Sequence, residues 1–285
     1  MILKRDCVLL KIGDVMRVLC CLLLGWSVLL SGCGGSEEDS SPPINTSSSA
    51  VKSDEKPQTV TESKEDAVAA IKELGGAVRF DEKSPGKPVI DVALLNTKVT
   101  DDGLVHLKGL ASLQMLSLAD TEVTDAGLGH LKGLKSLRTL DLSGTEVTDA
   151  GLVHLKGLTS LQTLGLRKIK LTGAGLVHLM GLTSLTDLSL SNTQVTDGGL
   201  EHLKGLISLQ VLTLGHGVTD TGLVHLKDLT NLKSLYFLGT QVTDVGLQHL
   251  KGMTSLHMLY LQDTQVTTAG VKDLQSALPK CRITK

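Results

Sequence analysis

Leucine and other aliphatic residues recur along this chain in a pattern that repeats about every 24 residues. Each unit opens with the spacing L-x-x-L-x-L, as at Leu137, Leu140 and Leu142. Residues two apart on an extended chain share one face, so Leu140 and Leu142 predict a strand with its leucines buried. Thr139 and Asp141 alternate with these leucines and are expected on the opposite, exposed face of a sheet.

The second half of each unit, typified by V-T-D-A-G-L-V-H-L-K-G-L, predicts a turn and a short helix. Thr148 is a good N-cap, and the negative charge of Asp149 suits the first helical turn. Leu152 and Leu155 lie on one helical face, which can cover the buried side of the sheet. Gly157 ends the helix.

A fixed period in the twenties is typical of a solenoid built from stacked, nearly identical units. These motifs resemble leucine-rich repeats, and the V-T-D-x-G-L form is similar to a bacterial type related to the repeats found beside F-boxes. The resemblance covers roughly residues 65–285. It implies an α/β horseshoe with a parallel concave sheet, convex helices and terminal caps. The eight repeats are expected to start near Val89, Ala111, Lys135, Thr159, Thr183, Ile207, Thr230 and Thr254.

A glycine recurs inside every predicted helix, although glycine costs roughly 1 kcal/mol relative to alanine at such a position. On a helical wheel it lies beside the buried leucines and faces the neighbouring repeat. We therefore expect it to permit close stacking of successive helices. These glycines are too widely spread to predict a phosphate-binding loop. They are Gly103, Gly127, Gly151, Gly175, Gly199, Gly222, Gly246 and Gly270.

The beginning of the chain predicts export. Basic residues precede an apolar run over residues 18–30, which is the pattern of a secretory signal peptide. The sequence L-S-G-C then ends at Cys33 and resembles the box at which bacterial lipoproteins are acylated. The alternative is an ordinary signal anchor. Translation starting at Met16 would give a more typical signal length.

The composition beyond the predicted signal peptide indicates four further segments. Residues 33–62 are rich in serine and acidic residues and are expected to form a disordered tether. The spacing of apolar residues predicts a helix over 66–74 and strands over 77–80 and 89–92, with a turn at 84–86. The predicted domains are a signal peptide at 1–32, the tether at 33–62, an N-terminal cap at 63–88, repeats at 89–277 and a C-terminal cap at 278–285.

Charge and cysteine content exclude some classes of function. The formal net charge is -2, which leaves no basic footprint for nucleic acid. Beyond Cys33, the chain contains one further cysteine, Cys281, so an intrachain disulfide framework is excluded. We expect Cys281 to be a small buried residue of the cap. No cofactor or small-molecule substrate is indicated.

Seven histidines occupy the same position in successive repeats, which raises the question of a metal site. Metal sites need a closed ligand geometry supported by a second shell, whereas a regular row offers mainly pairs. We therefore expect each histidine to pack locally and bind no metal. A Ser-His-Asp catalytic group is also disfavoured, because the repetition creates no unique pocket. The histidines are His106, His130, His154, His178, His202, His225 and His249.

Candidate binding residues lie where the repeats depart from their consensus. Tyr236 and Tyr260 fall at the same outward strand position of adjacent repeats and are expected to stack on the concave face. Leu238 and Met258 should adjoin them, while Phe237 replaces a core leucine. Exposed tyrosines beside apolar side chains are typical interface anchors. The alternative is two scattered surface tyrosines.

A second departure lies in the fourth repeat. Arg167 and Lys168 begin the sequence R-K-I-K, which replaces the usual S-G-T-E, and Gly173 replaces the repeated aspartate. The basic residues could bind an acidic partner, or they could reflect drift in one repeat.

The sequence thus predicts a non-enzymatic, exported leucine-rich repeat protein, anchored by lipid to the outer membrane or cell surface. We expect a monomer that binds an unknown protein through its concave face. One alternative is an F-box-like ubiquitin ligase adaptor, but the export signal argues against a cytosolic adaptor. A structural envelope component is a further alternative.

The lipid anchor is tested by replacing its acceptor. Cys33→Ser should abolish metabolic labelling of the chain by fatty acid and leave an uncleaved or soluble product. The measurement is incorporation of labelled palmitate into wild type and variant expressed in parallel. Labelling that persists in the variant would exclude Cys33 as the acylation site.

Overall fold

A computed structural model describes residues 62–285. The predicted signal peptide, the lipid attachment at Cys33 and almost all of the predicted tether lie outside the described residues. No helix within residues 62–285 is both long and apolar enough to cross a bilayer.

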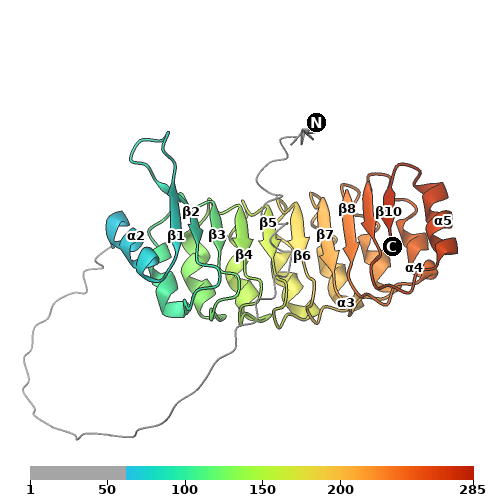
Figure 1. The fold of residues 1–285 in the computed structure, drawn as a ribbon, viewed down its shortest axis with the longest axis horizontal. Helices are drawn as coiled ribbons and strands as arrows, with labels where there is room; N and C mark the ends of the chain where they lie inside the picture. Colours follow the sequence, from blue (N-terminus) through green and yellow to red (C-terminus); the bar gives the residue numbers. More distant parts are fainter. Residues whose placement is uncertain (1–61) are drawn as a thin grey trace, which may run out of the picture. The chain divides into compact units, whose positions relative to one another are not determined.

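Ten strands form one sheet in which each strand lies beside its neighbours in sequence (Figure 1). β1 and β2 pair antiparallel, and every later pair is parallel. The strands β2 to β9 come from the eight repeats, so the predicted parallel sheet is confirmed. The strands are β1 Ala77–Phe80, β2 Val89–Ala93, β3 Met115–Ser117, β4 Thr139–Asp141, β5 Thr163–Gly165, β6 Asp187–Ser189, β7 Val211–Leu214, β8 Ser234–Phe237, β9 Met258–Tyr260 and β10 Arg282–Thr284.

The helical segments of the repeats are shorter and tighter than the sequence suggested. Most are 3₁₀ helices, which rise further per residue than α-helices and therefore suit the few residues available for the return path. The helices are α2 Lys64–Glu73, η1 Asp101–Leu107, η2 Gly127–Gly133, η3 Gly151–Leu155, η4 Gly173–Leu179, α3 Asp197–Leu200, η5 Glu201–Leu203, η6 Gly222–Leu226, α4 Asp244–Leu247, η7 Gln248–Leu250 and α5 Thr268–Ala277.

One continuous core lies between the sheet and these helices. Leu140 from β4, Leu142 directly after it, and Leu152 and Leu155 from η3 are all fully buried, as their spacing predicts. Phe237 takes the place of a core leucine and is also fully buried. The leucines of successive repeats stand in register across the sheet, so each repeat packs on the two beside it.

Neighbouring repeats are also joined by a repeated polar contact, which we call the Asp-Thr ladder. In one rung, Oδ1 of Asp125 accepts a hydrogen bond from the backbone N–H of Thr148 at 2.7 Å. Its Oδ2 accepts a second from the Thr148 hydroxyl at 2.6 Å. The rungs are Asp101 to Thr124, Asp125 to Thr148, Asp149 to Thr172, Asp197 to Thr219, Asp220 to Thr243 and Asp244 to Thr267.

The ladder changes the interpretation of Asp149. The sequence places this aspartate in the first turn of its own helix, but η3 begins only at Gly151. The carboxylate of Asp149 instead binds Thr172 and the backbone N–H of Gly175, both in the next repeat. The aspartate therefore joins repeats rather than stabilising the end of its own helix.

The ladder also explains the recurrent glycine. A Cβ atom on Gly151 would overlap Oδ1 of Asp125, and one on Gly175 would overlap Oδ1 of Asp149. Most of these glycines therefore leave room for the carboxylate of the preceding repeat. Direct stacking of helix backbones, which we expected throughout, accounts for Gly199, whose Cβ would meet the backbone of Gly173.

Gly173 interrupts the ladder, because it stands where six of the other seven repeats carry the bonding aspartate. Its backbone lies directly against that of Gly199, so van der Waals contact replaces two charge-assisted hydrogen bonds at this junction. The same repeat contains a second irregularity. Lys168 adopts φ 58°, at a turn position that Gly144 fills in the preceding repeat with φ 70°. A lysine is less stable than a glycine in this left-handed conformation.

The first and last described helices differ from the others. The expected helix and two strands near the beginning are present as α2, β1 and β2, and the Ser63 hydroxyl accepts a hydrogen bond from the N–H of Asp66. At the other end, α5 is a regular α-helix whose N-cap, Thr267, belongs to the last rung. Cys281 is buried, as expected.

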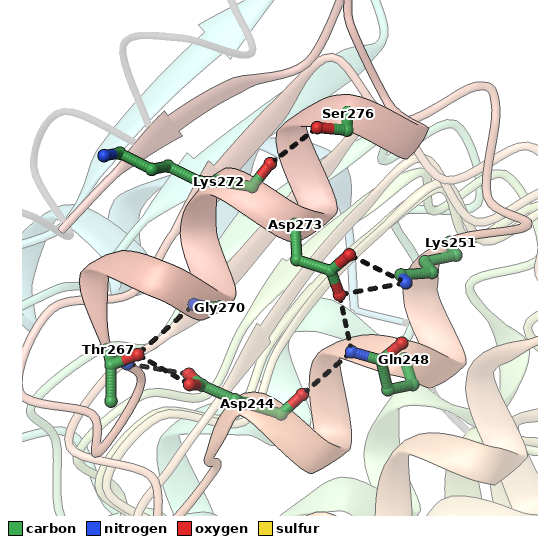
Figure 2. A network of polar contacts seen from close by, with 8 residues as sticks. All are labelled: Asp244, Gln248, Lys251, Thr267, Gly270, Lys272, Asp273 and Ser276. Carbon is green, nitrogen blue, oxygen red and sulfur yellow. Dashed lines mark hydrogen bonds and ion pairs between the residues drawn. The ribbon is translucent and has the colours of Figure 1, made fainter.

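Figure 2 shows how α5, the helix of the last repeat, is attached to the repeat before it. Asp244 binds Thr267, and Asp273 of α5 accepts a hydrogen bond from Gln248 at 2.8 Å and pairs with Lys251 at 2.9 Å. The hydrogen bond from Gln248, together with the nearby Lys251, holds the pKa of Asp273 below its ordinary value.

Removing one rung tests the energetic role of the ladder. Asp125→Ala deletes both hydrogen bonds to Thr148 and leaves a part-buried N–H without its partner, which should lower the free energy of unfolding by about 1–3 kcal/mol. Urea unfolding monitored by circular dichroism measures the change. Asp102→Ala, which removes the same charge at an exposed position, is the matched control and should stay within about 0.5 kcal/mol of wild type. Equal effects of the two substitutions would contradict a structural role for the rung.

Candidate binding surface

The side of the sheet opposite the helices carries two rows of side chains, which we call the outer sheet face. The strand register defines both rows. Row one contains Asp91, Met115, Thr139, Thr163, Asp187, Val211, Ser234, Met258 and Arg282. Row two contains Ala93, Ser117, Asp141, Gly165, Ser189, Thr213, Tyr236, Tyr260 and Thr284.

Tyr236 and Tyr260 occupy adjacent places in row two and stack as the sequence predicts. Their ring centroids lie 4.5 Å apart and their planes differ by 5°. Both side chains are half-buried. Burial raises the pKa of Tyr236, and Tyr260 and Asp187 raise it further, so its hydroxyl stays protonated at neutral pH. The pair is therefore an aromatic surface with two hydroxyl groups that can form hydrogen bonds.

The two predicted apolar neighbours lie close to the tyrosines in the chain. Met258 is a half-buried member of row one, in the same strand as Tyr260 and two residues before it. Leu238 lies two residues after Tyr236, just beyond the end of β8, and is also half-buried. Side chains two residues apart in a strand point to the same side, which brings Met258 to the outer sheet face with Tyr260.

The basic residues of the fourth repeat form a separate group. Lys168 is exposed and Arg167 is half-buried, and both follow β5. Three strand spacings, about 14 Å, separate β5 from the β8 strand that carries Tyr236. The structure therefore does not bring Arg167 and Lys168 together with the tyrosine pair.

Most of the remaining outer sheet face is small or polar, and Asp141 is less accessible than the sequence indicates. The strand alternation predicts exposure for Asp141, but only 8% of it is exposed. Its Oδ1 accepts a hydrogen bond from the N–H of Ser143 at 3.0 Å and lies where a Cβ of Gly165 would be. This carboxylate therefore packs against the sheet, and little of its surface is accessible to a partner.

Asp187 is a feature of the surface that the sequence analysis missed. It is the aspartate of row one on β6, and its carboxylate accepts a hydrogen bond from the Thr186 hydroxyl at 2.6 Å. Burial raises the pKa of Asp187 above its ordinary value, despite that hydrogen bond. Aligning the repeats by their strand leucines would have placed Asp187 in row one, next to the row that contains the tyrosines. However, nothing in the sequence distinguishes this aspartate from the other acidic residues, of which the chain has 30 in total.

For two of the seven repeat histidines, the structure lowers the pKa and so disfavours the protonated form. Burial lowers the pKa of His130, helped by Lys108, and burial likewise lowers the pKa of His178, helped by Lys156. Nδ1 of His178 is buried without a hydrogen-bond partner in the structure. Within residues 62–285, no three His, Cys, Asp or Glu side chains are grouped so that they could hold a metal ion.

Comparisons with known proteins agree with the repeat geometry. A family model described as "Leucine Rich repeat" matches residues 133–155 and 181–204. The structure of an internalin C2 from Listeria monocytogenes str. 4b F2365 is similar over 76% of this chain and 92% of that chain, with 27% identity and a TM-score of 0.54. The chain is a leucine-rich repeat solenoid.

Two further comparisons add little about this solenoid. An internalin, inlF, from the same strain is similar over 63% of this chain and 56% of that chain, with 22% identity and a TM-score of 0.49. No curated protein matches the sequence significantly. The match to the repeat family model and the similarity to internalin C2 establish the leucine-rich repeat fold.

The histidines of the leucine-rich repeats generate a prediction about acid. The pKa values of His130 and His178 are lowered from 6.5, so the folded protein binds their protons less readily than the unfolded chain does. Their stabilising contribution is therefore present above about pH 6.5 and is lost as the pH falls through the lowered folded pKa values. We expect the melting temperature to fall between pH 7.5 and pH 5.5.

A double variant separates this effect from the titration of carboxylates. His130→Gln with His178→Gln should show a smaller fall over the same pH interval, measured by circular dichroism melts. Hydrogen bonds from Thr219 and Thr221 overcome the effect of burial and hold the pKa of Asp197 below 3.8, so this ladder carboxylate loses its protective effect only at lower pH. An identical fall in wild type and double variant would rule out the histidines as its cause.

Proposed function

We propose that this leucine-rich repeat protein binds another protein through the outer sheet face, with Tyr236 and Tyr260 at the centre of the contact. The observation that carries the proposal is the stacked tyrosine pair, which stands half-exposed on a face otherwise composed mainly of short or polar side chains. Rigid aromatic side chains supply most of the binding energy in many protein interfaces.

The surroundings of the pair support this role. Met258 and Leu238 add apolar surface at its edge, and the two tyrosine hydroxyls can satisfy polar groups of a partner. Stacking holds each ring in one orientation, so little side-chain entropy remains to be lost on binding. An interface at this place would therefore be pre-formed.

We further propose that the protein is exported and held at the outer membrane or cell surface by a lipid on Cys33. The support is the order of a basic region, an apolar run and the L-S-G-C box in the sequence. Such an anchor would present the repeats to other proteins outside the cytoplasm. Arg167 and Lys168 would form a separate, secondary contact for an acidic region of a partner.

The first experiment identifies the partner. The full chain, purified with its anchor in detergent, is used to capture binding components from envelope extracts of the cell that produces it. A protein that binds saturably supports the proposal. Retention of a wall polymer in its place would indicate the structural role, and turnover of a component would indicate an enzyme.

The tyrosines can then be tested directly. The double substitution Tyr236→Ala with Tyr260→Ala should weaken binding of the captured protein about thirtyfold, since truncating central aromatic anchors costs on the order of 2 kcal/mol. Titration calorimetry of wild type and variant measures the change. Both rings lie outside the core, so the circular dichroism melt should change little.

Two control variants complete this experiment. Thr139→Ala with Thr163→Ala alters row one at a distance from the tyrosines and should leave the affinity unchanged. Leu235→Ala truncates a fully buried core residue of the same strand as Tyr236 and should destabilise the fold by about 2–5 kcal/mol. Wild-type affinity in the tyrosine double variant would contradict the proposed contact surface.

A further inference from the structure

In the stacked tyrosine pair, the face of the Tyr236 ring that does not contact Tyr260 points along the sheet, toward the preceding strand. The 4.5 Å between the ring centroids is close to the distance of about 4.8 Å between neighbouring strands. The two parallel rings are therefore stacked along the direction from strand to strand. One face of Tyr236 packs on Tyr260 of β9, and its other face points toward β7.

Short side chains stand in front of that outer ring face. In row two, Thr213 on β7 and Ser189 on β6 precede Tyr236, and Gly165 precedes them on β5. A hydroxyl-bearing side chain of this size rises much less above a sheet than a tyrosine ring does. The outer face of Tyr236 therefore stands beside the shorter side chain of Thr213 on the neighbouring strand.

Asp187 stands on the same side of Tyr236 as Thr213, one strand further away. It occupies row one on β6, two strand spacings and about 10 Å from β8, the strand of Tyr236. Val211, its neighbour in row one, lies on the intervening strand β7. The charge of Asp187 also contributes to the raised pKa of Tyr236, after burial and Tyr260. Within residues 62–285, no basic side chain forms an ion pair with Asp187.

We propose that the outer face of Tyr236 and the carboxylate of Asp187 hold one arginine side chain of the partner protein. A guanidinium is planar and stacks on an aromatic face, and it can also bind a carboxylate through two parallel hydrogen bonds. Val211 offers apolar surface to the methylene groups of the arginine. Binding of the guanidinium also places a positive charge next to the part-buried carboxylate of Asp187. This inference rests on the proposed function and specifies the chemistry of the partner.

The two tyrosines allow a direct measurement, because the chain contains no others. Full-length protein with ¹³C-labelled tyrosine gives the ring signals of two residues, which Tyr260→Phe assigns. The probes are N-acetyl-arginine amide, N-acetyl-lysine amide and the neutral analogue N-acetyl-citrulline amide. We expect arginine amide to shift the Tyr236 signals saturably with a Kd on the order of 1–10 mM, as a ligand of this size allows.

The analogue and the variants decide the assignment. Citrulline amide should bind at least about tenfold more weakly, and lysine amide more weakly than arginine amide, because neither matches both charge and planarity. Asp187→Asn should weaken arginine binding about tenfold, whereas Asp91→Asn in the same row should have no effect. Thr213→Phe places a large side chain beside the outer face of Tyr236 and should abolish the shift without removing either proposed contact residue.

Several results would overturn the inference. They are unchanged Tyr236 signals, equal binding of arginine and citrulline or of arginine and lysine, and full binding by Asp187→Asn or Thr213→Phe. Failure of this arginine site can be distinguished from failure of the proposed function. A partner that loses affinity for the tyrosine double variant while arginine amide fails to bind would leave the protein contact intact and exclude only the arginine.

Discussion

The structure depends on the way in which each repeat is bonded to the next. Buried leucines pack between repeats everywhere, but leucine packing alone has little directional preference. The aspartate of one repeat supplies direction, because its two carboxylate oxygens bind one backbone N–H and one hydroxyl of a single threonine in the next. Charge-assisted hydrogen bonds of this kind are stronger and more geometrically demanding than neutral ones. The ladder therefore fixes the register between neighbours, and the recurrent glycine follows from the space that the carboxylate occupies.

The fold followed from the sequence because the signals were repeated. Leu140 and Leu142 specify a strand face, and the same spacing in successive units leaves one architecture that buries them all. The stacking of Tyr236 on Tyr260 was predictable for the same reason, since repeat alignment gives the register directly. What could not be predicted were contacts between non-equivalent positions of adjacent repeats. The bond from Asp149 to Thr172 joins residues 23 apart, and no periodicity within one helix reveals it.

The same limit applies to the candidate site. Row membership was accessible from the sequence, but the accessibility of individual side chains was not. Asp141 and Asp187 both stand on the outer sheet face, yet Asp141 bonds to a backbone N–H and is nearly buried while Asp187 bonds to a neighbouring hydroxyl. The group with which each carboxylate forms its hydrogen bond therefore determines how accessible that carboxylate is to a partner protein. The tyrosines and Asp187 form one candidate surface on β6 to β9, and the basic pair after β5 lies apart from it.

The interruption at Gly173 has a consequence for how the solenoid opens. Repeat proteins unfold in units whose size is set by the strength of the contacts between neighbours. Three rungs of the ladder lie before the interruption and three after it. The junction that lacks a rung thus falls near the middle of the array and separates the basic pair from the strands that carry Asp187 and the tyrosines. Partial opening there would divide the solenoid into two cooperative blocks, each with one of the two contact groups intact. A partner held by both groups would bridge this junction and close it.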